Sequence, residues 1–292
     1  MDLGDRVLDV RMGRFFNCDP DEQKYPFQST YTVATNNPVH IIDVDGRGPT
    51  STHLDQAGKV IAVYNDGDLN VYKHQTAKNQ EDVDKWRLKF NNKSGNGIKI
   101  GRTLIWNSFY DDATETYRGS ISDVNKTSGW AFMISAWDDI KNTSSDDLLR
   151  RTYYAFNAHE YDKYDFKNKG KNKSTPENEL LENRYRGSVL MYDGTTPIYA
   201  SARDVGNYFA GVVASRTHEK KIEFLQIAGA FNYHNQNIKK VINSIAIDFK
   251  DVPIKFPTYG EDFRSDYFHR VGYHEIIGVD QLKKLGSKLW IE

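Results

Sequence analysis

The spacing of apolar residues changes near residue 145, and this change limits the folds that the chain can adopt. Before this point, apolar residues alternate with polar ones, which is the period of half-buried strands. After it, apolar residues recur at intervals of three and four, which is the period of amphipathic helices. We therefore predict an α+β fold, with a β-rich N-terminal half that contains hairpins and a helical C-terminal region whose site is carried by a loop.

The strand signals lie between about residues 50 and 140. Val60, Ala62 and Tyr64 alternate in GKVIAVYND, and GDLNVYKH follows across an Asn-Asp-Gly turn. This pattern predicts a hairpin over Val60 to Tyr72. The segment IKIGRTLIWNSF is predicted to be a further strand.

Three segments of the second half carry helix signals. The first helix is predicted to begin with Ser145 as its N-cap and two aspartates in its first turn. Four of its residues recur at helical spacing: Leu148, Leu149, Thr152 and Phe156. The second is predicted to begin with Ser201 as N-cap, and the third to cover Lys221 to Tyr233.

The helix after Ser201 has a polar stripe beside its apolar face. At 100° per residue, a sector only about 80° wide contains Asp204, Asn207, Gly211 and Ser215. Two interpretations remain open. The glycine allows another backbone to approach closely while Asp204 interacts with the helix dipole, or the stripe forms the floor of a ligand site beside an acid and an amide.

Two later regions concentrate titratable groups. His234 lies at the predicted end of the third helix, where the helix carbonyls stabilise a cation. The segment FPTYGEDFRSDYFHRVGYHEI is predicted to be a fixed loop because of its proline and glycine. Its charges beside aromatic rings indicate either a site or a surface ion-pair cluster. They include Glu261, Arg264, His269 and Arg270.

Composition sets further limits. The chain has 292 residues, a formal net charge of -1 and a single cysteine, Cys18, which cannot form an internal disulfide. This charge balance allows a polyanionic substrate without implying one. No segment reaches the roughly 18 apolar residues of a membrane span, and the first residues lack the apolar region of a signal peptide. We expect no membrane insertion, and either a cytoplasmic location or secretion by a leaderless specialised system.

Three short motifs occur in a fixed order within residues 1–47. They are MDLGDRVLDVRMGRFFNCDP, NNPVHIID and DVDG. Their order and spacing resemble the end of the core domain of Rhs/YD-repeat proteins, where a YDYGARMYDPRLGRFLSVDP phrase precedes NNP and D-x-x-G. The resemblance implies the last part of a β-cage that encloses a toxic C-terminal domain. It therefore implies an Rhs cage as partner in a full-length relative.

Three blocks of the remaining chain also follow a recognisable order. SARDVGNYFAG, FLQIAGAFNYH and YGEDFRSDYFHRVGY resemble the GN-x-x-AG, AGA and YGE blocks of variable tails on Rhs proteins of Bacteroidetes-type bacteria. The resemblance implies a polymorphic-toxin-like effector with a cognate immunity protein, but it implies no particular reaction. The predicted division is a core remnant (1–48), a β-rich connector (49–142) and an α-rich effector domain (143–292).

The reaction is inferred from the residues. Metalloprotease, NTPase and nucleophile-elbow motifs are absent, and the groups that remain suit general acid/base hydrolysis. The predicted catalytic residues are Asp204, Glu261, His234 and His269. The predicted substrate-binding residues are Arg203, Asn207, Tyr259, Arg264 and Arg270. We predict that these patches meet across one cleft, and we assign no metal and no cofactor.

Two classes of function remain open. The first is a toxic hydrolase of nucleic acid or cell-wall glycan. For a glycosidase, the carboxyl groups of Asp204 and Glu261 would lie about 5 to 10 Å apart. The second is a non-enzymatic interaction or target-binding module, and an inactive fragment of an Rhs protein is a further alternative.

Overall fold

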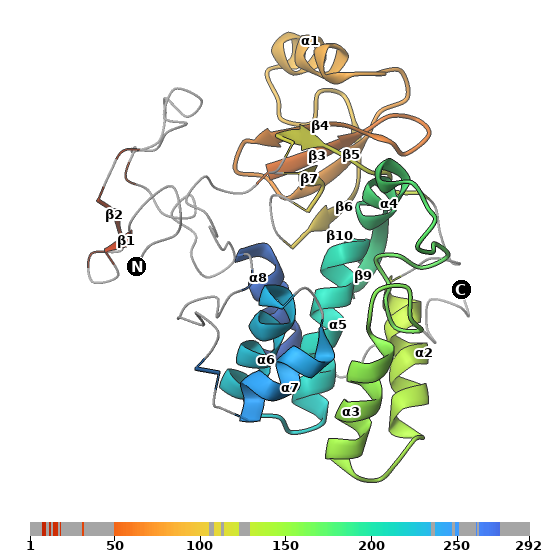
Figure 1. Cartoon of the computed structure of the whole chain (residues 1–292). Coiled ribbons are helices and arrows are strands. Elements are labelled where there is room, and N and C mark those ends of the chain that lie inside the picture. The colour runs from red at the N-terminus through yellow and green to blue at the C-terminus, as the bar shows by residue number, and fades with distance from the viewer. Residues whose placement is uncertain are drawn as a thin grey trace. The chain divides into compact units, whose positions relative to one another are not determined.

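Strands and helices both build this chain, which confirms the α+β prediction (Figure 1). The computed structural model describes residues 8–9, 12, 14–16, 18, 31, 50–104, 108–111, 114–122, 129–234, 237–246, 249–250, 261 and 263–274. The chain forms a β unit, Met1–Asn125 with Leu181–Ser201, and a helical unit, Lys126–Leu180 with Ala202–Glu292. The segment 181–201, predicted to lie in the α-rich domain, thus belongs to the β unit.

A six-stranded mixed sheet forms the β unit, in the order β4-β3-β5-β6-β10-β9. Two neighbouring pairs, β3 with β5 and β6 with β10, are parallel, and the other pairs are antiparallel. The strands are β3 (Thr50–Leu54), β4 (Val60–Asn65), β5 (Asn70–Lys73), β6 (Ile98–Thr103), β9 (Gly187–Asp193) and β10 (Thr196–Ser201). Short pairs also occur: β1 (Leu8–Asp9) with β2 (Arg14–Phe15), and β7 (Tyr110–Asp111) with β8 (Thr116–Tyr117).

The predicted hairpin over Val60 to Tyr72 is wrong, because β3 lies between β4 and β5 and pairs with both. The hairpin of this region joins β3 to β4. In its turn the Lys59 backbone N–H donates to Asp55 Oδ1 at 2.8 Å, and Gly58 adopts a φ of 87°. All five residues of β3 are buried although three of them are Ser or Thr, so the strand lacks an alternating pattern.

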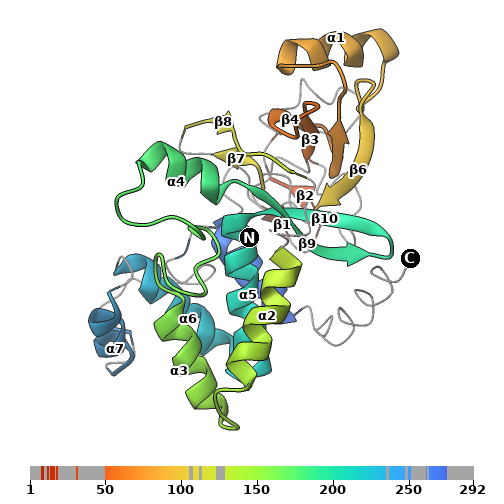
Figure 2. The same cartoon turned by 90° about the vertical axis from the view of Figure 1, so that its right-hand side faces the viewer.

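Helices α2, α3 and α5 to α8 form the helical unit (Figure 2). An aromatic cluster joins three of its segments: the ring of Phe132 packs on Phe166 and Phe209, at centroid distances of 4.6 and 5.5 Å. The helices of the chain are α1 (Gln80–Phe90), α2 (Gly129–Lys141), α3 (Asp147–Asn157), α4 (Glu177–Arg184), α5 (Ala202–Arg216), α6 (Lys221–Tyr233), α7 (Ile238–Ala246) and α8 (Phe263–His274).

The helix predicted near residue 145 is α3, with one correction. Its N-cap is Asp146 rather than Ser145, and the Asp146 side chain accepts a hydrogen bond from the Leu149 backbone N–H at 2.9 Å. The apolar residues used for the prediction do not face the core. Leu148, Leu149 and Phe156 expose 63%, 58% and 56% of their surface.

The segment predicted to be a loop is helical over Phe263–His274, which form α8. The apolar side of this helix includes Phe268, which is fully buried. Three of the charged residues assigned to this loop, Arg264, His269 and Arg270, lie on the helix, whereas Glu261 precedes it. Tyr259, at the start of the predicted loop, lies outside the described residues.

A buried chain of polar side chains extends through the β unit from β3. Ser51 Oγ donates to Asp66 Oδ2 at 2.8 Å and lies 3.2 Å from His53 Nε2, while His53 Nδ1 lies 2.8 Å from His74 Nε2. Arg87 Nη1 also donates to Asp66 Oδ2, at 2.8 Å. The Asp66 carboxylate accepts the bonds from Ser51 and Arg87. The remaining hydrogen bonds are satisfied when both imidazoles are neutral, with His74 donating its Nε2–H to His53 Nδ1 and His53 donating its Nε2–H to Ser51 Oγ.

The environment of these histidines opposes protonation. Burial, followed by the charges of His74 and Arg87, lowers the pKa of His53 to about 2. Burial also lowers the pKa of His74. Both imidazoles therefore stay neutral at pH values where free histidine becomes charged.

Acidification should destabilise the β unit. The unfolded chain binds protons at its histidines near pH 6.5, but folded His53 does not, so stability is complete above this pH and decreases below it. We expect the free energy of unfolding to fall by about 1 kcal/mol for this imidazole between pH 7.5 and 5.5. Urea titrations followed by circular dichroism measure this change.

The exposed His218 offers a matched control. His218→Gln should keep the pH dependence of the wild type, whereas His53→Gln should weaken it. The window ends at pH 5.5 because burial raises the pKa of Asp66, which acts in the opposite direction at lower pH. An unfolding free energy that is constant over this window would contradict the neutral histidine pair.

Candidate functional site

Two glycines allow α5 and α8 to lie side by side with their backbones in contact (Figures 1 and 2). A Cβ atom at Gly211 would lie 2.2 Å from the carbonyl oxygen of His269, and one at Gly272 would lie 2.0 Å from that of Tyr208. These separations exclude every residue with a side chain. Gly211 thus allows the backbone of α8 to approach closely, which was the first of the two interpretations of the polar stripe.

A side-chain hydrogen bond also joins the two helices. Asn207 Nδ2 donates to Ser265 Oγ at 2.9 Å, across a sequence separation of 58 residues. Gly211 meets His269 at the same separation, so the helices run in the same direction. Glu261 is half-buried and precedes the first turn of α8.

Two acid–arginine pairs flank this contact. Arg203 Nε donates to Asp204 Oδ1 at 3.3 Å, and Arg270 Nε donates to Asp266 Oδ2 at 2.6 Å. The carboxylate side chains expose 0% and 9% of their surface, whereas the guanidinium side chains expose 24% and 27%. Each buried acid therefore orients a cation that remains accessible to a ligand.

His269 and Lys221 complete the polar group. His269 is buried, and its ring packs edge-to-face on Phe224 of α6 with a centroid distance of 5.4 Å. Burial, followed by the positive charge of Arg270, lowers the pKa of Lys221, and Asp266 opposes this effect. The first turn of α6 thus brings a third cation near the Arg270 pair.

The remaining predicted residues are Arg264, Tyr259 and His234. Arg264 is the second residue of α8, and its side chain, like Tyr259, lies outside the described residues. His234 is the C-cap residue of α6, where its Nε2 lies 2.8 Å from Ser244 Oγ of α7. Because Ser244 Oγ donates to the Lys240 carbonyl oxygen, His234 is the donor to Ser244. The structure thus brings the α5 stripe to the YGE block and places His234 in the α6–α7 contact.

Sequence reasoning missed three residues of this group, Ser265, Lys221 and Gly272, and it noticed Asp266 only as one of the charged residues of the predicted loop. The signal for α8 was present, because Ser265, His269 and Tyr273 recur every four residues on one helical face. Read as a helix, the segment would also have shown Asp266 and Arg270 at ion-pair spacing. The contact at Gly272 has no comparable sequence signal.

Within the described ranges, no group of three or more His, Cys, Asp or Glu side chains is arranged to hold a metal ion. No helix among these residues is long and apolar enough to cross a membrane. Comparisons with protein-family models, curated proteins and solved structures find no match.

The glycine contact can be tested with two alanines in one helix. Gly211→Ala should destabilise the protein by roughly 1–3 kcal/mol or more, because the new Cβ meets the α8 backbone. Gly206→Ala is the matched control, since its Cβ would meet nothing within 4 Å. That change should stabilise the helix by roughly 0.5–1 kcal/mol. Thermal and urea unfolding of both variants would show the difference, and equal stabilities would contradict the close helix contact.

Proposed function

We propose that this protein is an Rhs-associated, polymorphic-toxin-like effector whose helical unit hydrolyses phosphodiester bonds of nucleic acid at the α5–α8 contact. The observation that supports this proposal is the convergence of three sequence blocks on His269. Asn207 and Gly211 of the GN-x-x-AG block contact Ser265 and His269 of the YGE block, and Phe224 of the AGA block packs on the same histidine.

The cations around this point favour a phosphate substrate. Arg203 and Arg270 keep about a quarter of their side chains exposed while buried acids hold them. Lys221 lies close enough to Arg270 for the positive charge to lower its pKa. Guanidinium groups held in this way can bind phosphate oxygens and stabilise the negative charge that develops during hydrolysis.

In the proposed mechanism, His269 and the half-buried Glu261 perform acid–base catalysis. One accepts the proton of the attacking nucleophile, and the other donates a proton to the leaving oxygen. Asp204 and Asp266 are positioning residues, because each holds an arginine and neither exposes more than 9% of its side chain. Asn207 fixes the register of α8 through Ser265 and thereby the position of His269.

Hydrolysis of cell-wall glycan is less well supported. A glycosidase would use Asp204 and Glu261 as its carboxyl pair, and both would have to reach the sugar ring. Asp204 exposes none of its side chain and is engaged by Arg203. The arginines also match a phosphate better than a neutral sugar.

A non-enzymatic interaction module is supported by a different observation. The exposed apolar residues of α3 and α7 suit a protein partner, and a cognate immunity protein is the proposed one. They are Leu148, Leu149, Phe156, Ile242 and Ile245.

The test is hydrolysis by the purified full-length protein. Labelled RNA and DNA are the substrates, peptidoglycan is the comparison, and each is assayed with and without divalent metal. His269→Gln and Glu261→Gln should each lower nucleic-acid cleavage by roughly 100- to 10,000-fold. Arg270→Gln should weaken substrate binding as well as turnover, because it removes a phosphate contact.

His218→Gln is the matched control for the catalytic histidine. His218 lies in the same unit, and its side chain is 84% exposed and bonded to Asp147. This variant should cleave like the wild type. Circular dichroism would establish that each variant is folded. Wild-type protein that cleaves neither nucleic acid, or folded His269→Gln and Glu261→Gln variants that both retain full activity, would rule out the proposed site.

A further inference from the structure

The β unit contains a stretch with a strong charge bias. No acidic residue occurs between Asp84 and Asp111, whereas this interval contains six Lys or Arg residues. Three of the six form ion pairs: Arg87 with Asp66, Arg102 with Asp193, and Lys85 with Asp82 at 4.0 Å. The four lysines are exposed, and they are Lys85, Lys89, Lys93 and Lys99. The segment from α1 to β6 therefore presents positive charge to solvent.

Aromatic rings lie within this basic segment. The rings of Trp86 and Phe90 are nearly parallel, at an interplanar angle of 5° and a centroid distance of 5.5 Å. Lys89 Nζ lies 5.1 Å from the Trp86 centroid and 5.7 Å from that of Phe90. Phe90 exposes 45% of its surface. Two stacked rings and a cation thus occupy the same outer surface.

Helical geometry groups these side chains and separates them from the core. At 100° per residue, Lys85, Trp86, Lys89 and Phe90 lie within a sector of about 140°. We call these four residues the α1 platform. The buried Val83 packs against Ile61 and Ala77 of the β unit and anchors the helix. In Figures 1 and 2, α1 lies at the outer edge of this unit.

We propose that the α1 platform binds single-stranded nucleic acid. An unstacked base can extend the Trp86–Phe90 stack on the exposed Phe90 ring, and the lysines on the same sector can contact the adjacent phosphates. This combination of aromatic stacking and backbone neutralisation is how proteins bind single strands without reading their sequence. Paired bases of a duplex do not offer their faces to such a ring.

An anionic membrane fits the platform less well. Insertion into the interface needs a continuous apolar face opposite a basic one. The most exposed apolar residue of α1, Leu88 at 83%, lies on the opposite side of the helix from Trp86. The platform alternates rings with lysines instead, which suits a chain that alternates bases with phosphates.

The platform belongs to the β unit and does not depend on the proposed hydrolytic site. Its test is therefore binding rather than cleavage. Fluorescence anisotropy of the full-length protein would use labelled single strands of DNA and RNA with phosphorothioate linkages, which resist hydrolysis. The same sequence annealed to its complement and phosphatidylserine vesicles are the comparison ligands.

Phe90→Ala should weaken single-strand binding by about 5- to 100-fold, because a base loses its stacking partner. Leu88→Ala is the matched control on the opposite side of the same helix and should bind like the wild type. The double variant Lys85→Gln/Lys89→Gln should reduce the slope of log affinity against log salt concentration by about 1.4, since two phosphate contacts are lost.

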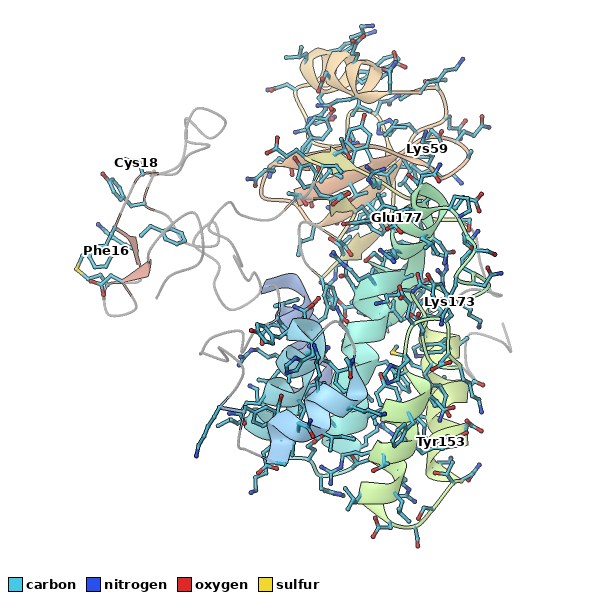
Figure 3. The ribbon with its side chains drawn as sticks, in the orientation of Figure 1. Phe16, Cys18, Lys59, Tyr153, Lys173 and Glu177 are labelled. Carbon is cyan, nitrogen blue, oxygen red and sulfur yellow. The ribbon has the colours of Figure 1, made fainter. Side chains whose placement is uncertain are left out.

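Lys59→Gln/Lys78→Gln is the charge-matched control in the same unit. Both lysines are exposed, and Figure 3 shows Lys59 away from α1. This variant should keep the wild-type slope. Absence of single-strand binding, equal affinity for the duplex, or equal effects of the platform and control variants would overturn the proposal. Vesicle binding that the platform variants abolish, without binding to single strands, would assign the surface to lipid instead.

Discussion

The helical unit depends on the backbone contact between α5 and α8. Gly211 and Gly272 remove the two Cβ atoms that would otherwise hold the helices apart. Because main-chain atoms meet directly, the helices cannot slide without a clash, and their register is fixed. Asn207 and Ser265 then meet within hydrogen-bond distance, and Phe224 of α6 packs against His269. This contact therefore places Asn207 of α5 beside Ser265 of α8.

The β unit is organised by a different constraint, a polar chain inside its sheet. Ser51 and His53 are fully buried on β3, and burial of such groups is tolerated only when their hydrogen bonds are satisfied. Asp66 supplies the hydrogen-bond partner of Ser51, and His74 supplies that of His53. Because β3 consists mostly of buried polar residues, its sequence lacks the alternation of apolar and polar residues that predicts a strand.

Regular local signals made part of the fold predictable. The bounds predicted for α6, Lys221 to Tyr233, agree with the structure, because the segment is uninterrupted and periodic. The bounds of α8 were not predictable in the same way. Pro257 and Gly260 precede it, and the density of charges after them resembles an exposed loop. The proline and glycine led to the prediction of a loop, although Ser265, His269 and Tyr273 recur every four residues, as they do in a helix.

The candidate site shows a similar division between local and long-range information. A helical wheel was sufficient to put Asp204, Asn207 and Gly211 on one stripe, since that relation depends only on the helical period. The partners of the stripe depend on tertiary packing. The stripe was expected to face His234 and the Tyr259–Glu261 turn; Asn207 instead bonds to Ser265 of α8, Tyr259 lies outside the described residues, and His234 lies in the α6–α7 contact. A histidine at a helix end has a local structural function available to it, and here that function accounts for its position.

Electrostatics explains why the α5–α8 contact suits an anionic ligand. Burying an ion pair rarely stabilises a protein more than apolar residues of similar size would, so Asp204–Arg203 and Asp266–Arg270 are weak contributors to folding stability. Their geometry instead keeps two guanidinium groups at fixed, partly exposed positions. Burial, followed by the positive charge of Arg270, lowers the pKa of Lys221, and Asp266 opposes this effect. An anion bound near Lys221 and Arg270 would weaken the repulsion between these two cations, which supports the proposed phosphate substrate.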